Sequence, residues 1–142
     1  MSVETSQKIL KIFGILSIIA GVAVIIFGIL GFFGGSMAGA NASTDEESAA
    51  IVVVMGASIV AVVEGIISLI EGVCSVRAAA DSSKIMPAWI FAILGVISGV
   101  IGMIGDIASG GEISTIVGGV LALCISVLIF RAANTIKQSL AG

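Results

Sequence analysis

The chain has 142 residues, of which 58% are apolar and 11% are charged, and its mean hydropathy is +1.29. This composition lies far outside the range of soluble domains and excludes a water-soluble fold. The formal net charge is −3, with six basic residues and no histidine. Six scattered bases make no nucleic-acid surface, and the missing imidazole excludes histidine-based catalytic triads and histidine metal ligation.

Four apolar runs in the chain are long enough to cross a bilayer, because a membrane-spanning helix needs about 20 residues. No run shows the strict alternation that is typical of strands. We therefore predict an all-α, polytopic membrane protein, a four-transmembrane-helix bundle that forms a single membrane domain over residues 1–142. The expected spans are residues 9–33, 45–76, 87–107 and 113–131.

The first span carries glycines at a strict seven-residue interval, at Gly14, Gly21, Gly28 and Gly35. Residues seven apart lie on nearly the same helix face, so these glycines make a smooth stripe that a neighbouring backbone can approach closely. Alternatively, these glycines reflect only the fact that glycine is frequent in membrane helices in general.

The second span begins with Thr44 and Glu47, which match the capping-box pattern at a helix N-terminus. Deeper in the same span lie two carboxylates, Glu64 and Glu71, with Ser68 between them. A spacing of seven residues puts both acids on nearly one face, about 10 Å apart along the axis. An ionisable residue inside a membrane is by default a functional-site hypothesis, so Glu64, Glu71 and Ser68 are our candidate ion or proton pathway.

A non-catalytic assembly role is the alternative interpretation of the same residues. Protonated glutamates can hydrogen-bond between helices, and glycine faces promote helix association. In this interpretation the chain is a homo-oligomer or binds a membrane-protein partner, and ligand or lipid binding remains a third possibility. The candidate packing glycines are Gly14, Gly21, Gly28, Gly65, Gly72, Gly95, Gly99 and Gly102.

The third span starts with Pro87, which suits the first turn of a helix, and with Trp89, a residue typical of membrane interfaces. It also repeats the first span: residues 12–22 align without gaps on residues 90–100, with seven of eleven positions identical. Both halves of the chain then end in Arg-Ala-Ala, at residues 77–79 and 131–133. We therefore predict two parallel helical-hairpin repeats related by an axis along the membrane normal.

The basic residues predict the orientation of the chain. With four spans, all of them fall on one side of the membrane, and the positive-inside rule makes that side cytoplasmic. We expect a cell-membrane protein whose N- and C-termini are both cytoplasmic. The bases are Lys8, Lys11, Arg77, Lys84, Arg131 and Lys137, and the opposite loops carry Asp45, Glu46, Glu47 and Glu112.

The sequence offers no enzymatic chemistry, and we expect neither a cofactor nor a metal site. Cys74 and Cys124 are lone thiols inside the spans, without the spacing of a zinc site, and are expected to serve packing. No glycine-rich phosphate loop follows a strand. The expected partners are therefore the lipid bilayer and other membrane helices.

One fragment resembles a known family. Pro87-Ala88-Trp89, followed by Ile97-Ser98-Gly99, is similar to the start of a helix in the CD20-like membrane-spanning four-domain family. The likeness covers about 13 residues, with the spacing shifted by one. It implies oligomers that modulate ion flux or signalling. More broadly, the chain resembles small prokaryotic four-span proteins in composition.

Overall fold

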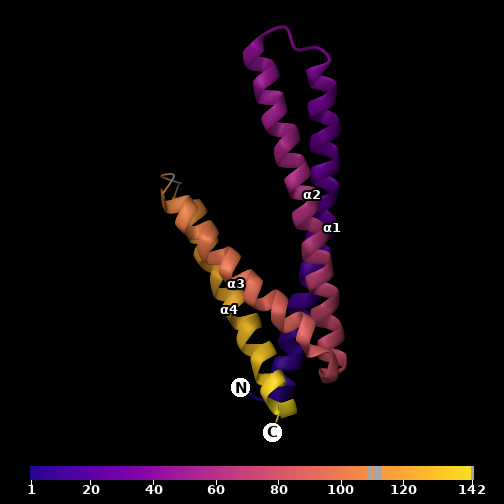
Figure 1. The fold of residues 1–142 in the computed structure, drawn as a ribbon, viewed down its shortest axis with the longest axis vertical. Helices are drawn as coiled ribbons and strands as arrows, with labels where there is room; N and C mark the ends of the chain where they lie inside the picture. The colour runs from indigo at the N-terminus through magenta and orange to yellow at the C-terminus, as the bar shows by residue number, and fades with distance from the viewer. Residues whose placement is uncertain (109, 111–112, 142) are drawn as a thin grey trace. The chain divides into compact units, whose positions relative to one another are not determined.

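The computed structural model describes residues 1–108, 110 and 113–141, and within the helices it leaves the surroundings of positions 102, 105, 106, 113–116 and 118 undescribed. The described residues form four long helices and no strand, so the all-α prediction is confirmed (Figure 1). All four are long and apolar enough to cross a membrane. They are α1 (Val3–Gly39), α2 (Asp45–Ala80), α3 (Ile85–Ala108) and α4 (Ile113–Ala141), with a 3₁₀ turn, η1 (Ser82–Lys84), before α3.

The helices are longer than the predicted spans because helix formation does not stop where the apolar run stops. α1 begins six residues before the predicted span and continues six residues beyond it, to Gly39. The ten residues between the second and third predicted spans are mostly helical: α2 continues to Ala80, and η1 leads into α3. Pro87 lies in the first turn of α3, as predicted.

The chain divides into two compact units. The terminal unit consists of Met1–Ile15 and Val73–Gly142, and the hairpin unit consists of Leu16–Gly72. The terminal unit therefore contains both termini, the α2–α3 connection and all six basic residues. The hairpin unit contains most of α1 and α2, and no basic residue.

In the hairpin unit, the predicted capping box at the start of α2 is confirmed. The Glu47 amide donates to Thr44 Oγ1 at 3.2 Å, and the Thr44 amide donates back to Glu47 Oε2 at 3.3 Å. The same carboxylate accepts the Ser43 amide at 2.8 Å. These bonds satisfy amides that a helix N-terminus leaves without intrahelical partners.

The two helices of this unit run antiparallel and touch along the glycine stripe of α1. A Cβ placed on Gly21 would lie 2.7 Å from the Gly65 carbonyl oxygen, and one placed on Gly28 would lie 2.9 Å from the Ser58 carbonyl oxygen. Further along, a Cβ on Gly35 would meet the Met55 side chain at 2.9 Å. Because real Cβ atoms do not approach so closely, only glycine permits this helix separation.

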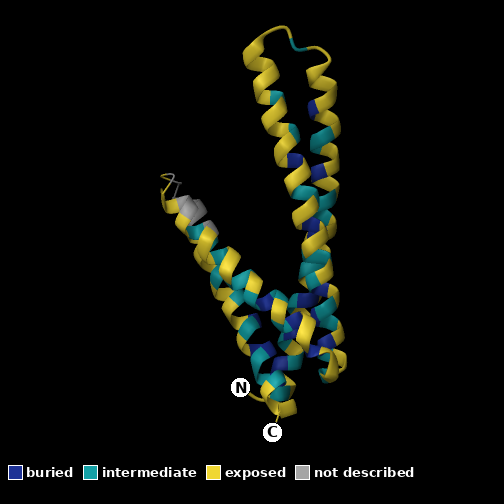
Figure 2. Cartoon of the chain, in the orientation of Figure 1, coloured by how far each residue is buried: buried dark blue, intermediate teal, exposed yellow. Residues whose placement is uncertain are grey.

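The terminal unit holds the buried core of the protein, to which all four helices contribute (Figure 2). Small residues dominate it, and they include Ala78, Ala132 and Ala133 of the two Arg-Ala-Ala sequences. Trp89 and Phe130 pack at its edge, with ring centroids 6.5 Å apart. The buried members are Leu10, Ala78, Ile85, Ala88, Ala92, Ile129, Ala132, Ala133 and Ile136.

The sequence repeat is also visible in the burial of side chains. When residues 12–22 are aligned on residues 90–100, nine of the eleven pairs share the same degree of burial, the exceptions being Ile15 with Ile93 and Gly21 with Gly99. In the second helices of the two halves, Arg77 and Arg131 are both exposed, whereas Ala78 and Ala132 are both fully buried. Equivalent residues thus have equivalent environments, as expected for two related hairpins.

Candidate functional site

The carboxylates of α2 lie on the side of the helix that does not contact α1. The residues of α2 that approach the glycine stripe are Met55, Ser58, Val62, Gly65 and Leu69. With 100° of rotation per residue, Glu64 and Glu71 point about 140–160° away from the centre of that contact face. The two acids share one face, as the seven-residue spacing predicts, and α1 does not cover it.

The three candidate pathway residues differ in exposure. Glu64 is exposed, whereas Ser68 and Glu71 are half-buried. The hairpin unit contains no lysine or arginine that could neutralise these acids. Around Glu64 the α2 surface is apolar, since Val60, Val63 and Ile67 are each about half exposed. The carboxyl group of Glu64 therefore lies on an otherwise hydrocarbon-like surface.

The candidate packing glycines differ in what they contact and in how far they are buried. Gly21 and Gly28 of α1 and Gly65 of α2 make close backbone approaches inside the hairpin unit. Gly14 and Gly72 are buried, and Gly95 is half-buried. A Cβ on Gly99 would meet Leu123 of α4 at 3.3 Å, so this glycine contacts its own chain. The environment of Gly102 lies outside the described residues, as does Glu112.

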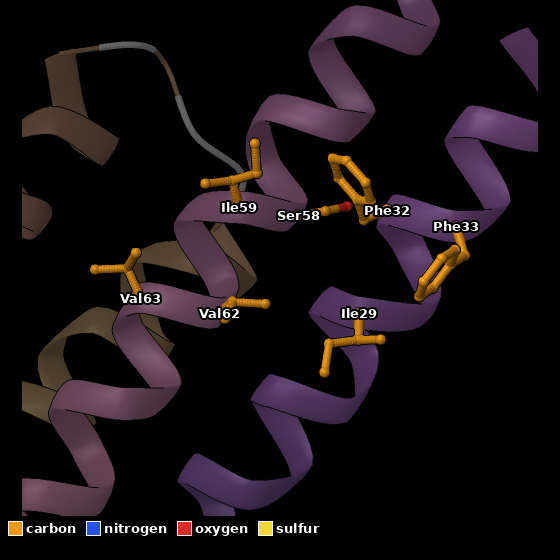
Figure 3. A pocket seen from close by; sticks show the side chains of 7 residues that line it. All are labelled: Ile29, Phe32, Phe33, Ser58, Ile59, Val62 and Val63. Carbon is orange, nitrogen blue, oxygen red and sulfur yellow. The ribbon is translucent and has the colours of Figure 1, made fainter.

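The hairpin unit also has an open apolar pocket of about 340 Å³ between α1 and α2, which the sequence analysis did not anticipate (Figure 3). Its single polar residue, Ser58, points toward α1, and its hydroxyl donates to the Val54 carbonyl oxygen at 2.7 Å. A Cβ on Gly31 would lie 2.7 Å from that hydroxyl. The lining residues are Ile29, Phe32, Phe33, Ser58, Ile59, Val62 and Val63.

Among the described residues, no group of three or more aspartate, glutamate, cysteine or histidine side chains is placed to hold a metal ion. Cys74 is half-buried against the terminal core, whereas Cys124 is exposed, and neither forms a disulfide. The chemistry that the described side chains offer within the apolar segments is therefore that of two carboxyl groups and neighbouring serine hydroxyls.

No family model, no curated protein and no solved structure matches the chain. The resemblance of the Pro87-Ala88-Trp89 fragment to the CD20-like family therefore stays a prediction. The four apolar helices are compatible with a multi-pass membrane protein in contact with the lipid bilayer.

Proposed function

We propose that this protein is a small proton- or cation-conducting transporter or channel subunit in which Glu64 and Glu71 carry the ion. The observation that supports this proposal is the position of both acids on one face of α2, inside an apolar segment, with no base in their unit. A lone carboxylate near the middle of a membrane helix costs roughly 2.5–3.5 kcal/mol. In this proposal, the conducted proton or cation offsets that cost as it passes.

Ser68 completes the proposed path. It lies one turn from both acids, and its hydroxyl can donate to or accept from a carboxyl group. Protons or cations would pass between Glu64 and Glu71 over about 10 Å with the help of this hydroxyl and water. In the predicted topology Glu71 is nearer the cytoplasmic side, because it is only six residues from Arg77.

Ion flux into proteoliposomes tests the proposal. We expect Glu64→Gln, which keeps size and polarity but cannot ionise, to lower flux at least tenfold, and Glu71→Gln to lower it less. Glu46→Gln is the matched control because Glu46 is exposed in the first turn of α2, outside the apolar segment. Full flux in Glu64→Gln, or no flux above protein-free liposomes, would rule out the pathway.

A second candidate, helix assembly, is favoured by the exposure of Glu64. A neutral carboxyl on an apolar surface can hydrogen-bond to a neighbouring helix, which makes oligomerisation favourable. Two substitutions of Glu64 distinguish ion conduction from helix assembly. Glutamine keeps hydrogen bonding but cannot ionise, whereas leucine can do neither. If the protein serves assembly alone, sedimentation in detergent should show that Glu64→Gln keeps the oligomer and that Glu64→Leu loses it. Neither the unaltered chain nor the two variants should then conduct ions.

A further inference from the structure

The terminal unit presents bases at the boundary between polar and apolar sequence on three of its four helices. Lys11 of α1, Arg77 of α2 and Arg131 of α4 each lie at the end of the predominantly apolar stretch of their helix. On α3, Trp89 lies five residues after Lys84, near the start of the apolar stretch of that helix. We call these four residues the collar.

Each collar residue is the chain neighbour of a member of the same buried core. Leu10, Ala78 and Ala132, the chain neighbours of the three bases, are all fully buried members of that cluster. Ala88, the neighbour of Trp89, is 2% exposed and belongs to it as well. All four collar residues therefore adjoin the one buried core of the terminal unit.

The internal repeat relates the collar residues in pairs. Extending the alignment of residues 12–22 and 90–100 by one position matches Lys11 with Trp89, and the two Arg-Ala-Ala sequences match Arg77 with Arg131. The three bases are exposed, whereas Trp89 is half-buried. The two hairpins thus contribute equivalent positions to one collar.

The remaining bases of this unit already have partners. Lys8 pairs with Glu4 at 2.8 Å, and Lys84 pairs with Asp81 at 3.2 Å. The Lys137 ammonium lies 3.3 Å from the centroid of the Trp89 ring. The salt bridges among the described residues involve none of the three collar bases.

We propose that the collar binds the phosphate groups of anionic phospholipids. Three exposed cations at the edge of the apolar segments lie where lipid headgroups lie when the four helices span a bilayer. The guanidinium groups of Arg77 and Arg131 suit phosphate oxygens because they donate two parallel hydrogen bonds. Trp89 suits this position, since indole rings favour the headgroup region of a bilayer.

The single tryptophan of the chain makes the proposal testable without a label. The full chain is reconstituted in mixed phosphatidylcholine–phosphatidylglycerol vesicles in which either lipid carries brominated acyl chains, which quench tryptophan on contact. We expect brominated phosphatidylglycerol to quench Trp89 more than brominated phosphatidylcholine at the same mole fraction. In Arg77→Gln/Arg131→Gln the preference should fall by roughly fivefold for each base removed.

Lys8→Gln/Lys84→Gln is the matched control, since it removes the same charge from the same unit at positions paired with acids. It should keep the preference. Arg77→Lys/Arg131→Lys keeps the collar charge but loses the paired hydrogen bonds of the guanidinium groups, so it should keep only part of the preference. Equal quenching by both lipids in the unaltered chain, or an equal loss in the Lys8/Lys84 control, would overturn the collar as a site. Loss of the preference on adding inorganic phosphate, but not chloride at equal ionic strength, would support a site that recognises the phosphate group. Equal loss with both salts would show unspecific attraction between charges and overturn the site.

Discussion

Gly21 and Gly65 face each other across the α1–α2 hairpin, and each occupies the space that a side chain on the other would need. A Cβ on Gly21 would lie 2.7 Å from the Gly65 carbonyl oxygen, and a Cβ on Gly65 would lie 2.8 Å from the Gly21 carbonyl oxygen. Since the obstructing atoms belong to helical backbone, they cannot move aside as a flexible side chain can.

This contact predicts opposite effects of alanine at different glycines. Gly21→Ala and Gly65→Ala should each destabilise the hairpin by about 1–3 kcal/mol, because overpacking forces the helices apart. Gly34→Ala and Gly56→Ala are the matched controls, since a Cβ there meets nothing within 4 Å and alanine favours a helix by up to ~1 kcal/mol. Equilibrium unfolding in mixed micelles measures the differences, and destabilisation of equal size at all four sites would contradict the close approach.

The capping box predicts a local effect at the start of α2. Thr44→Ala removes the hydroxyl that accepts the Glu47 amide and should cost about 1 kcal/mol. Exchange of the Glu47 amide hydrogen should then become roughly fivefold faster. Thr44→Ser keeps the acceptor and should exchange as the unaltered chain does; equal acceleration in both variants would argue against the cap.

The contact between Lys137 and Trp89 predicts that charge, more than length, matters at position 137. Lys137→Met keeps the aliphatic stem but removes the cation above the ring, and should cost about 0.5–1 kcal/mol. Lys137→Arg should keep most of this stability. Thermal unfolding followed by the fluorescence of Trp89 reports the change, and an unaltered transition in Lys137→Met would show that the stacked cation contributes nothing.

The hydrogen bonds of the Asp81 carboxylate predict that the turn between α2 and α3 loses stability at low pH. The Ser83 hydroxyl donates to Asp81 Oδ1 at 2.6 Å, and this bond, with the Lys84 ammonium and the Ser83 amide, holds the pKa of the carboxyl below its usual range. A lowered pKa means that the stabilisation is complete above the ordinary aspartate pKa and is lost as pH falls through the folded-state pKa. Protection of the Ser83 amide should therefore decline below about pH 4.

Asp81→Asn is the control for that measurement. It cannot titrate, so protection of the Ser83 amide should no longer change over the same acidic range. A decline as steep as in the unaltered chain would show that another group controls the turn.

Much of the fold is predictable from local patterns in the chain. The apolar runs indicate the number of helices, since their length matches the bilayer and leaves few other solutions. The capping box at Thr44 and the position of Pro87 follow from short-range backbone chemistry. The apolar run predicts too short a helix for α1, because hydropathy indicates where a helix is apolar and says little about where its hydrogen bonding ends.

The sequence by itself determined that Glu64 and Glu71 share a helix face, because the pitch of an α-helix relates residues seven apart wherever the helix lies. The packing of α1 on the opposite face, through Gly21 and Gly65, which leaves Glu64 exposed, depends on contacts between distant segments. The tertiary structure also brings Leu10, Ala78 and Ala132 into one core. Such contacts depend on how side chains of distant segments fit together, and helical periodicity within one segment cannot specify its partner.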